Sequence, residues 1–280
     1  MSLISALSRV LRPLGIAGAT LMAFGFPAAA QAQGDLLVAP TRLVLDGRQG
    51  GEIILSNIGS EEATYRVTLE LRRMTPEGEL VPLEEGSEND IEIASMDMIR
   101  YAPRRVVLPP NQPQAIRVSA RPGANLPDGE YRVHMSFSAI PKPAEVTAET
   151  AGGSGLTINL VPIYGITMPI IVRKGNLEVV AGLADPQIID TPQGPAFALE
   201  ISRGGQASLY GDLVVYRQGA DEPVFLARGI GVYPEISGRR AVFGVPAEVA
   251  AAMRGPVRVE FREPSSLGGG LITSIDAVIR

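Results

Sequence analysis

From Leu36 to Ile140 apolar and polar residues alternate with a period near two, and turn residues interrupt the alternation roughly every eight to twelve positions. A period of two places successive side chains on opposite faces of an extended strand. Seven strands are predicted here, at 36–45, 52–57, 64–73, 91–99, 104–109, 114–120 and 130–140. This number and spacing of short strands is typical of an immunoglobulin-like β-sandwich.

After Arg173 the alternation continues in a looser form. It predicts a second β-sandwich, with one short helix at 246–255 and strands at 176–183, 196–203, 210–217, 223–233, 240–246, 255–263 and 271–280. The segment "VRKGN" is the first polar, glycine-containing break after a long apolar run, so we place a domain boundary there. The predicted fold is therefore all-β, with immunoglobulin-like domains at 33–173 and 174–280.

The first 32 residues have the composition of a secretory signal peptide. They contain Arg9 and Arg12, no acidic residue, an apolar run and the small-residue site Ala30-Gln31-Ala32. Cleavage is predicted before Gln33 and would leave 248 residues with 23 basic and 30 acidic side chains, a net charge of −7. This charge offers no general attraction to nucleic acid, and we expect an exported protein.

The residues that most enzymes need are scarce in this chain. Cysteine and tryptophan are absent and His134 is the single histidine, so zinc ligands and a serine-hydrolase base are in short supply. His134 lies within an alternating segment and is interpreted as a strand side chain. Met96 and Met98 lie two apart on a predicted strand, where two core methionines are favoured over a copper site. We expect no catalytic residue, no metal and no cofactor.

The segment "GLTINLVPIYGITMPIIVR" (155–173) carries no charge before its last residue. The charge-free window from Thr150 to Val172 is long enough to cross a membrane as a helix. Pro162, Pro169 and many β-branched residues favour a strand instead. Prolines are tolerated on edge strands, and a long apolar edge strand invites pairing with another chain. Pairing with a partner is therefore the favoured interpretation of this segment.

Five segments in register resemble the periplasmic pilus-assembly chaperones of the PapD type. They are "PTRLVLDG" (40–47), "ILSNIGSEEATYRV" (54–67), "RVVLPPNQPQAIRV" (105–118), "LPDGEYRVHMSFSAIP" (126–141) and the strand beginning "LTINL" (156–160). The resemblance covers 36–173, and the second domain carries no comparable motif, so the chain resembles a divergent member. The resemblance implies a boomerang-like arrangement of two domains, periplasmic location, and fimbrial subunits and an outer-membrane usher as partners.

The resemblance also implies roles for particular residues. Arg42 matches the arginine that grips the C-terminal carboxylate of the subunit. The strand lent to the subunit would present alternate apolar side chains, namely Leu156, Ile158, Leu160, Tyr164 and Ile166. The family's lysine on this strand is missing here, because "PIYGITMP" has no basic residue; either Arg42 acts alone or Arg117, Arg173 or Lys174 assists.

Glu130 and Arg173 match a salt bridge between the two domains of the family, and an ordinary surface pair is the alternative. Three classes of function follow from these expectations: a chaperone that donates a strand, a structural surface or adhesion subunit that polymerises through the same strand, and a secreted carbohydrate-binding or hydrolytic enzyme. The chaperone is favoured, self-association through the exposed strand is a further option, and the missing base argues against the enzyme.

Overall fold

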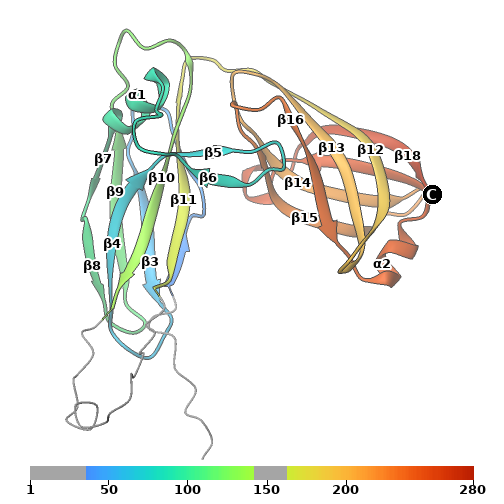
Figure 1. The fold of residues 1–280 in the computed structure, drawn as a ribbon, viewed down its shortest axis with the longest axis horizontal. Helices are drawn as coiled ribbons and strands as arrows, with labels where there is room; N and C mark the ends of the chain where they lie inside the picture. Colours follow the sequence, from blue (N-terminus) through green and yellow to red (C-terminus); the bar gives the residue numbers. More distant parts are fainter. Residues whose placement is uncertain (1–35, 142–162) are drawn as a thin grey trace, which may run out of the picture. The chain divides into compact units, whose positions relative to one another are not determined.

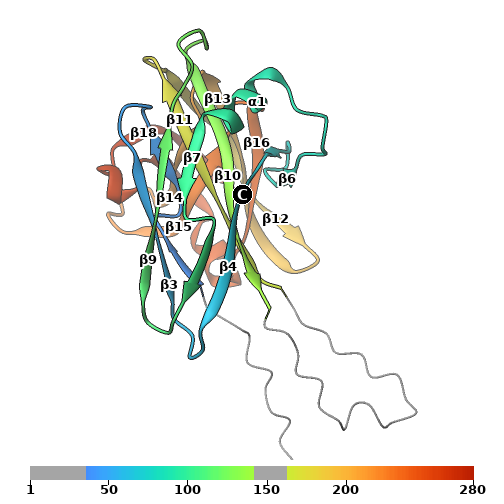
Figure 2. The same ribbon diagram turned by 90° about the vertical axis from the view of Figure 1, so that its left-hand side faces the viewer.

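The computed structural model describes residues 36–141 and 163–280. Apart from one short hairpin, the strands up to Lys174 form two sheets packed as a sandwich, called the first sandwich here (Figure 1). One sheet has the order β1 (Leu36–Ala39), β3 (Gly51–Asn57), β9 (Pro113–Ala120) and β7 (Ile99–Ala102). The other has the order β2 (Leu43–Leu45), β11 (Gly165–Lys174), β10 (Gly129–Ile140), β4 (Ala63–Glu70) and β8 (Arg105–Leu108). Figure 2 shows β3, β9 and β7 side by side.

Alternation along β10 explains how the first sandwich forms its core. Tyr131, Val133, Met135 and Phe137 are buried and face the opposite sheet, and their partners on β11 are the even-numbered residues from Ile166 to Val172. Buried apolar side chains of this kind dominate the favourable free energy of folding. On β11, the even-numbered residues therefore face the core and the odd-numbered residues face outward.

The second sandwich contains the remaining long strands. One sheet has the order β12 (Val179–Thr191), β13 (Gly194–Gly205) and β16 (Gly238–Gly244). The other has the order β15 (Pro223–Val232), β14 (Leu209–Arg217), β17 (Gly255–Arg262) and β18 (Leu271–Ile279). A second apolar core lies between them, and α2 (Ala247–Ala252) confirms the predicted helix. The all-β prediction is confirmed, and both sandwiches belong to one compact unit, Gln33–Arg280.

The segment 36–45, predicted as one strand, is two strands in different sheets. β1 pairs with β3 in one sheet, whereas β2 pairs with β11 in the other. Pro40 lies between them and has no backbone N–H to continue a ladder. The chain therefore crosses from one sheet to the other just before Arg42.

The prediction of a strand at 91–99 is wrong. Asp90–Met98 is the helix α1, followed directly by β7, and it lies against β10. Asn89 caps this helix: its side chain accepts from the backbone of Glu92, whose carboxylate accepts from the Asn89 backbone. Met96 and Met98 therefore lie on a helix, two residues apart and not on one shared face; Met98 is buried in the first core and Met96 packs partly against it.

Two further elements were missed. The segment "MTPEGELVP", interpreted as a turn, contributes to the hairpin of β5 (Arg72–Met74) and β6 (Leu80–Pro82), which extends from the strands of the first sandwich (Figure 1). β12 continues beyond its predicted end through an irregularity in its pairing between Ala184 and Gln187, where Asp185 has a φ of 50°. An extra residue of this kind interrupts the period of two, which hid the second half of the strand.

The sequence raised two questions about export and membrane insertion. The predicted signal peptide, 1–32, lies outside the described residues. Within 36–141 and 163–280, no helix has the length and apolar character needed to cross a membrane.

Candidate functional site

The apolar row of β11 extends beyond the core of its own sandwich. Met168 is 2 % exposed, Ile166 is 38 % exposed and Tyr164 is 56 % exposed, although all three share the core-side parity. The backbone ladder continues to Tyr164, whose carbonyl accepts from the Ala139 N–H at 3.0 Å. Exposure therefore rises along a regular strand because the opposing core ends. Leu156, Ile158 and Leu160, which have the same parity, lie outside the described residues.

One edge of β11 is open over five of its residues. β10 pairs with β11 from Gly165 to Lys174, but on the other side the parallel strand β2 pairs only with residues Ile170 to Val172. The edge from Gly165 to Pro169 therefore has no partner strand among the described residues, and it spans about 16 Å at the usual rise per residue. Unpaired edges of this kind accept added strands.

Arg42 lies at the end of this open edge. It directly precedes Leu43, the first residue of β2, which pairs with Ile170. Arg42 therefore lies where the covered part of the edge ends and the open part begins. This placement follows from the sheet crossing at Pro40, which brings the segment after β1 alongside β11. The open edge and Arg42 together are called the edge site below.

The Arg42 guanidinium is held by residues of the second sandwich. Its Nη2 donates to Ser208 Oγ at 2.8 Å, and its Cζ lies 4.4 Å from the ring centroid of Tyr210 and 6.0 Å from that of Tyr233. Its Nη1 is buried and has no hydrogen-bond partner in the described part of the chain. Burial lowers the pKa of Arg42 below its usual value, which nearby Tyr233 and Glu130 partly oppose.

Glu130 and Arg173 come together beside this group. Arg173 Nε lies 3.1 Å from Glu130 Oε2, and the same oxygen accepts from the backbone N–H of Ser208 at 3.0 Å and from its hydroxyl at 2.9 Å. The Glu130 side chain is fully buried, and its Oε1 has no partner within the described segments. The Glu130 carboxylate thus contacts both sandwiches through Oε2.

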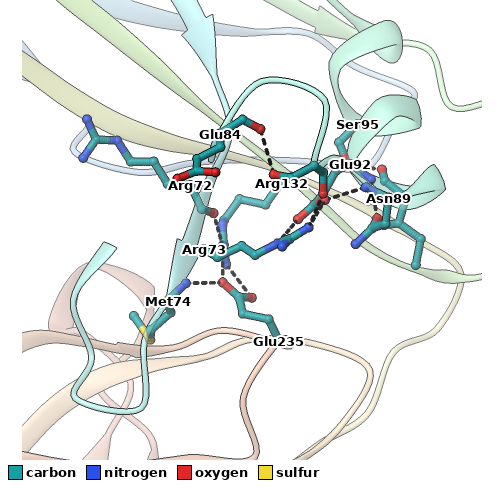
Figure 3. A network of polar contacts seen from close by, with 11 residues as sticks. Arg72, Arg73, Met74, Glu84, Asn89, Glu92, Ser95, Arg132 and Glu235 are labelled. Atoms are coloured by element: carbon teal, nitrogen blue, oxygen red, sulfur yellow. Dashed lines mark hydrogen bonds and ion pairs between the residues drawn. The ribbon is translucent and has the colours of Figure 1, made fainter. Parts of the chain in front are cut away.

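A second polar network joins the sandwiches at the base of the β5–β6 hairpin (Figure 3). Glu235 accepts from Arg132 at 2.5 Å and from the backbone N–H of Met74 at 2.7 Å. The Arg132 guanidinium also lies 3.7 Å from the ring centroid of Tyr233, and that ring packs with Met74 and Ile171. Burial raises the pKa of Tyr233, so its hydroxyl stays neutral between the two arginines.

The β5–β6 hairpin makes one more contact with the second sandwich. Arg239 Nη1 donates to the carbonyl of Gly78 at 3.1 Å. Gly78 has a φ of 88°, which favours glycine, and a Cβ there would lie 2.1 Å from Arg239 Nη1, so a larger residue would displace the arginine side chain. The hairpin therefore touches the second sandwich at its tip as well as at its base.

Metal-ligating side chains do not cluster in the described residues. These residues contain no group of three or more His, Cys, Asp or Glu side chains placed to hold a metal ion. His134 is 1 % exposed on β10, and neither ring nitrogen has a hydrogen-bond partner within the described ranges. Burial, together with Arg132 and Arg72, lowers the pKa of His134 to about 3, so the ring is neutral.

Sequence reasoning missed the contribution of the second sandwich to this region. Ser208, Tyr210 and Tyr233 carry no motif, and Ser208 is 166 residues from Arg42. One signal was present: "RGIGVY" has glycines inside a strand, at Gly229 and Gly231. Glycine within a strand marks a close approach by another group, and Tyr210 lies beside both positions.

No protein-family model matches the chain, and no curated protein matches it by sequence. Solved structures do match it. One is the complex of CsuC and the tip adhesion subunit CsuE, from archaic chaperone-usher Csu pili of Acinetobacter baumannii, with 12 % identity and a TM-score of 0.44 over 88 % of this chain and 98 % of that one.

Two further matching structures are the E. coli chaperone DraB and the Salmonella enterica SafA pilin in complex with the SafB chaperone. DraB has 14 % identity and a TM-score of 0.44, over 88 % of this chain and 97 % of that one. The SafA–SafB match has 14 % identity and a TM-score of 0.43, over 87 % of this chain and 96 % of that one.

Proposed function

We propose that the protein is a periplasmic chaperone that binds fimbrial or pilus subunits by lending them a strand, and that it delivers them to an outer-membrane usher. The observation that carries the proposal is the apolar row of β11, whose side chains become exposed where the core of the first sandwich ends. The backbone edge of the same segment is open, and Arg42 lies at its end. Export through cleavage of the signal peptide 1–32, domains at 33–173 and 174–280, and a binding function without catalysis or cofactor belong to the same proposal.

The edge site favours one direction for the bound strand. β2 runs parallel to β11 and covers the edge from Ile170 onward. A client strand on the remaining edge whose C-terminal carboxylate meets Arg42 must run toward Arg42, and therefore parallel to β11. Backbone hydrogen bonds would supply affinity, and the apolar side chains of β11 would enter the client's incomplete core.

Arg42 suits a carboxylate at that position. A guanidinium has five N–H donors in a planar arrangement that matches a carboxylate, and Nη1 has no partner in the described residues. Glu130 does not supply the missing anion through Oε2, since that oxygen already accepts from Arg173 and Ser208. The lysine of the family remains absent, and in this proposal Arg42 binds the carboxylate without it.

The structural β-sandwich subunit remains the second candidate, because an open apolar edge also serves polymerisation and self-association. The two candidates differ in stoichiometry. A chaperone forms a discrete complex with each client and prevents the client from polymerising. A surface subunit forms chains of its own copies through the same strand.

The test replaces Leu156, Ile158 and Leu160 together by Ser. The variant is produced in the periplasm with the products of neighbouring genes, and the readouts are co-purification of a client and protection of that client from protease. We expect a folded variant that neither retains nor protects the client, because the apolar side chains lent to the client are gone.

A matched control replaces three exposed apolar residues of the second sandwich, Val180, Val242 and Val278, by Ser. This control should retain the client. The chaperone proposal fails if the triple variant unfolds while each single replacement at 156, 158 or 160 still binds the client. These apolar residues would then belong to the core of the protein itself. Recovery of the wild-type protein as self-polymers without a client would favour the surface subunit.

A further inference from the structure

The guanidinium of Arg42 belongs to the first sandwich, but its contacts come from the second. Ser208 directly precedes β14, Tyr210 is the second residue of β14, and Tyr233 directly follows β15. These three side chains supply its hydrogen bond and the two aromatic rings near it. The orientation of Arg42 at the end of the open edge is therefore set by residues more than 160 positions away in the sequence.

The rings of Tyr210 and Tyr233 lie beside two glycines of β15. Tyr210 pairs with Gly231 on β15, and a Cβ on Gly231 would lie 3.9 Å from the Tyr210 ring and 3.8 Å from the Tyr233 ring. A Cβ on Gly229 would lie 3.3 Å from the Tyr210 hydroxyl. The distances at Gly231 are ordinary van der Waals contacts, and Gly229 has a φ of 71°, which favours glycine. Both rings thus lie against this segment of β15, and the pairing of β14 with β15 places Tyr210 there.

The way Arg42 is held leaves part of its hydrogen-bonding capacity unused. Ser208 accepts from Nη2, and the aromatic face of Tyr210 stabilises the positive charge without taking an N–H. Nη1 stays buried and without a hydrogen-bond partner among the described residues. A buried cationic donor without a partner costs free energy, and an arriving carboxylate would remove that cost.

We propose that the second sandwich completes the client site, with Ser208 and Tyr210 as positioning residues that hold Arg42 so that Nη1 receives the terminal carboxylate of the client strand. This inference rests on the proposed function, and it assigns a role in client binding to the second sandwich.

The test measures a preference and not only an affinity. The probe is a synthetic peptide of about ten residues of alternating valine and threonine, enough to cover the open edge. It is prepared with a free C-terminal carboxylate and, separately, with a C-terminal amide. Fluorescence anisotropy gives the two dissociation constants for the full mature protein and for its variants, and thermal unfolding reports whether each variant is folded.

The wild type should bind the carboxylate form about tenfold more tightly than the amide form, as one charge-assisted hydrogen bond from Nη1 allows. Arg42→Gln should abolish this preference. Tyr210→Leu and Ser208→Ala should each reduce it by about threefold or more, whereas Tyr210→Phe, which keeps the ring, should retain it. A residue that only joined the sandwiches would change stability without changing the ratio of the two constants.

The proposal is overturned if Arg42→Gln loses the preference for the carboxylate peptide while Tyr210→Leu and Ser208→Ala keep it. The client strand would then bind to Arg42 without a contribution from the second sandwich. Equal binding of both forms by the wild type would remove the carboxylate contact, and this inference with it. If the wild type binds neither form, the proposed function itself fails. Should Tyr210→Leu unfold, Ser208→Ala decides between these outcomes.

Discussion

The buried, neutral His134 predicts how stability depends on pH. Its folded pKa of about 3 lies below the ordinary value of 6.5, so protonation favours the unfolded chain. As pH falls below 6.5 the unfolded chain takes up a proton that the folded protein resists. The stability that is fully present above pH 6.5 is therefore lost progressively between pH 6.5 and about pH 3.

The magnitude follows from the width of that interval. Each pH unit corresponds to about 1.4 kcal/mol, so two units below the ordinary value, at pH 4.5, His134 should reduce the free energy of unfolding by about 2.7 kcal/mol. Both ring nitrogens lack partners among the described residues, so an apolar replacement leaves none of their neighbours unsatisfied. His134→Leu is therefore the matched variant without this proton-binding group.

Urea unfolding of both proteins at pH 7.5 and pH 4.5 measures the effect. Carboxylates titrate in both proteins, so their effect cancels in the comparison. The readout is the loss of unfolding free energy between pH 7.5 and pH 4.5 in the wild type minus the same loss in His134→Leu. The wild type should lose about 2.7 kcal/mol more than His134→Leu on acidification. Equal losses would mean that His134 is accessible or ion-paired in the folded protein, and would refute this description of the outer face of β10.

Two further variants test the elements that surround the junction of the sandwiches. Asn89→Ala should reduce the free energy of unfolding by about 1 kcal/mol in urea, because it removes the cap of α1; an unchanged value would contradict the capping box. Glu235→Ala should reduce it by about 2 kcal/mol, because Arg132, whose side chain is 9 % exposed, would lose its carboxylate. A loss within the error of the measurement would mean that this contact contributes nothing to stability.

The strands were largely predictable because sheets with one buried face impose a period of two on the sequence. β10 was predicted at 130–140 and lies at 129–140, and β14 was predicted at 210–217 and lies at 209–217. The helix α1 escaped because Ile91 and Ile93 imitate strand alternation, although both are exposed. The spacing of Asn89 and Glu92 was the available signal for a helix start.

The contacts around Arg42 could be predicted only in part. Its role as a carboxylate anchor was suggested by the motif "PTRLVLDG" near the start of the first domain, but its place at the end of the open edge of β11 was not. Ser208 and Tyr210 could not be found in this way, because a periodic pattern reports which face of a strand is buried and not which distant strand packs beside it. Only the three-dimensional structure brings these residues to Arg42.

The most direct test of strand capture is amide hydrogen exchange along β11, in the free protein and in the complex with a co-purified client. An added strand should protect those amides between Gly165 and Pro169 that point away from β10, and leave the exchange of β8, the opposite edge of the same sheet, unchanged. This result would locate the client on the open edge of β11. Protection at β8 instead, or a client bound with no change along β11, would contradict it.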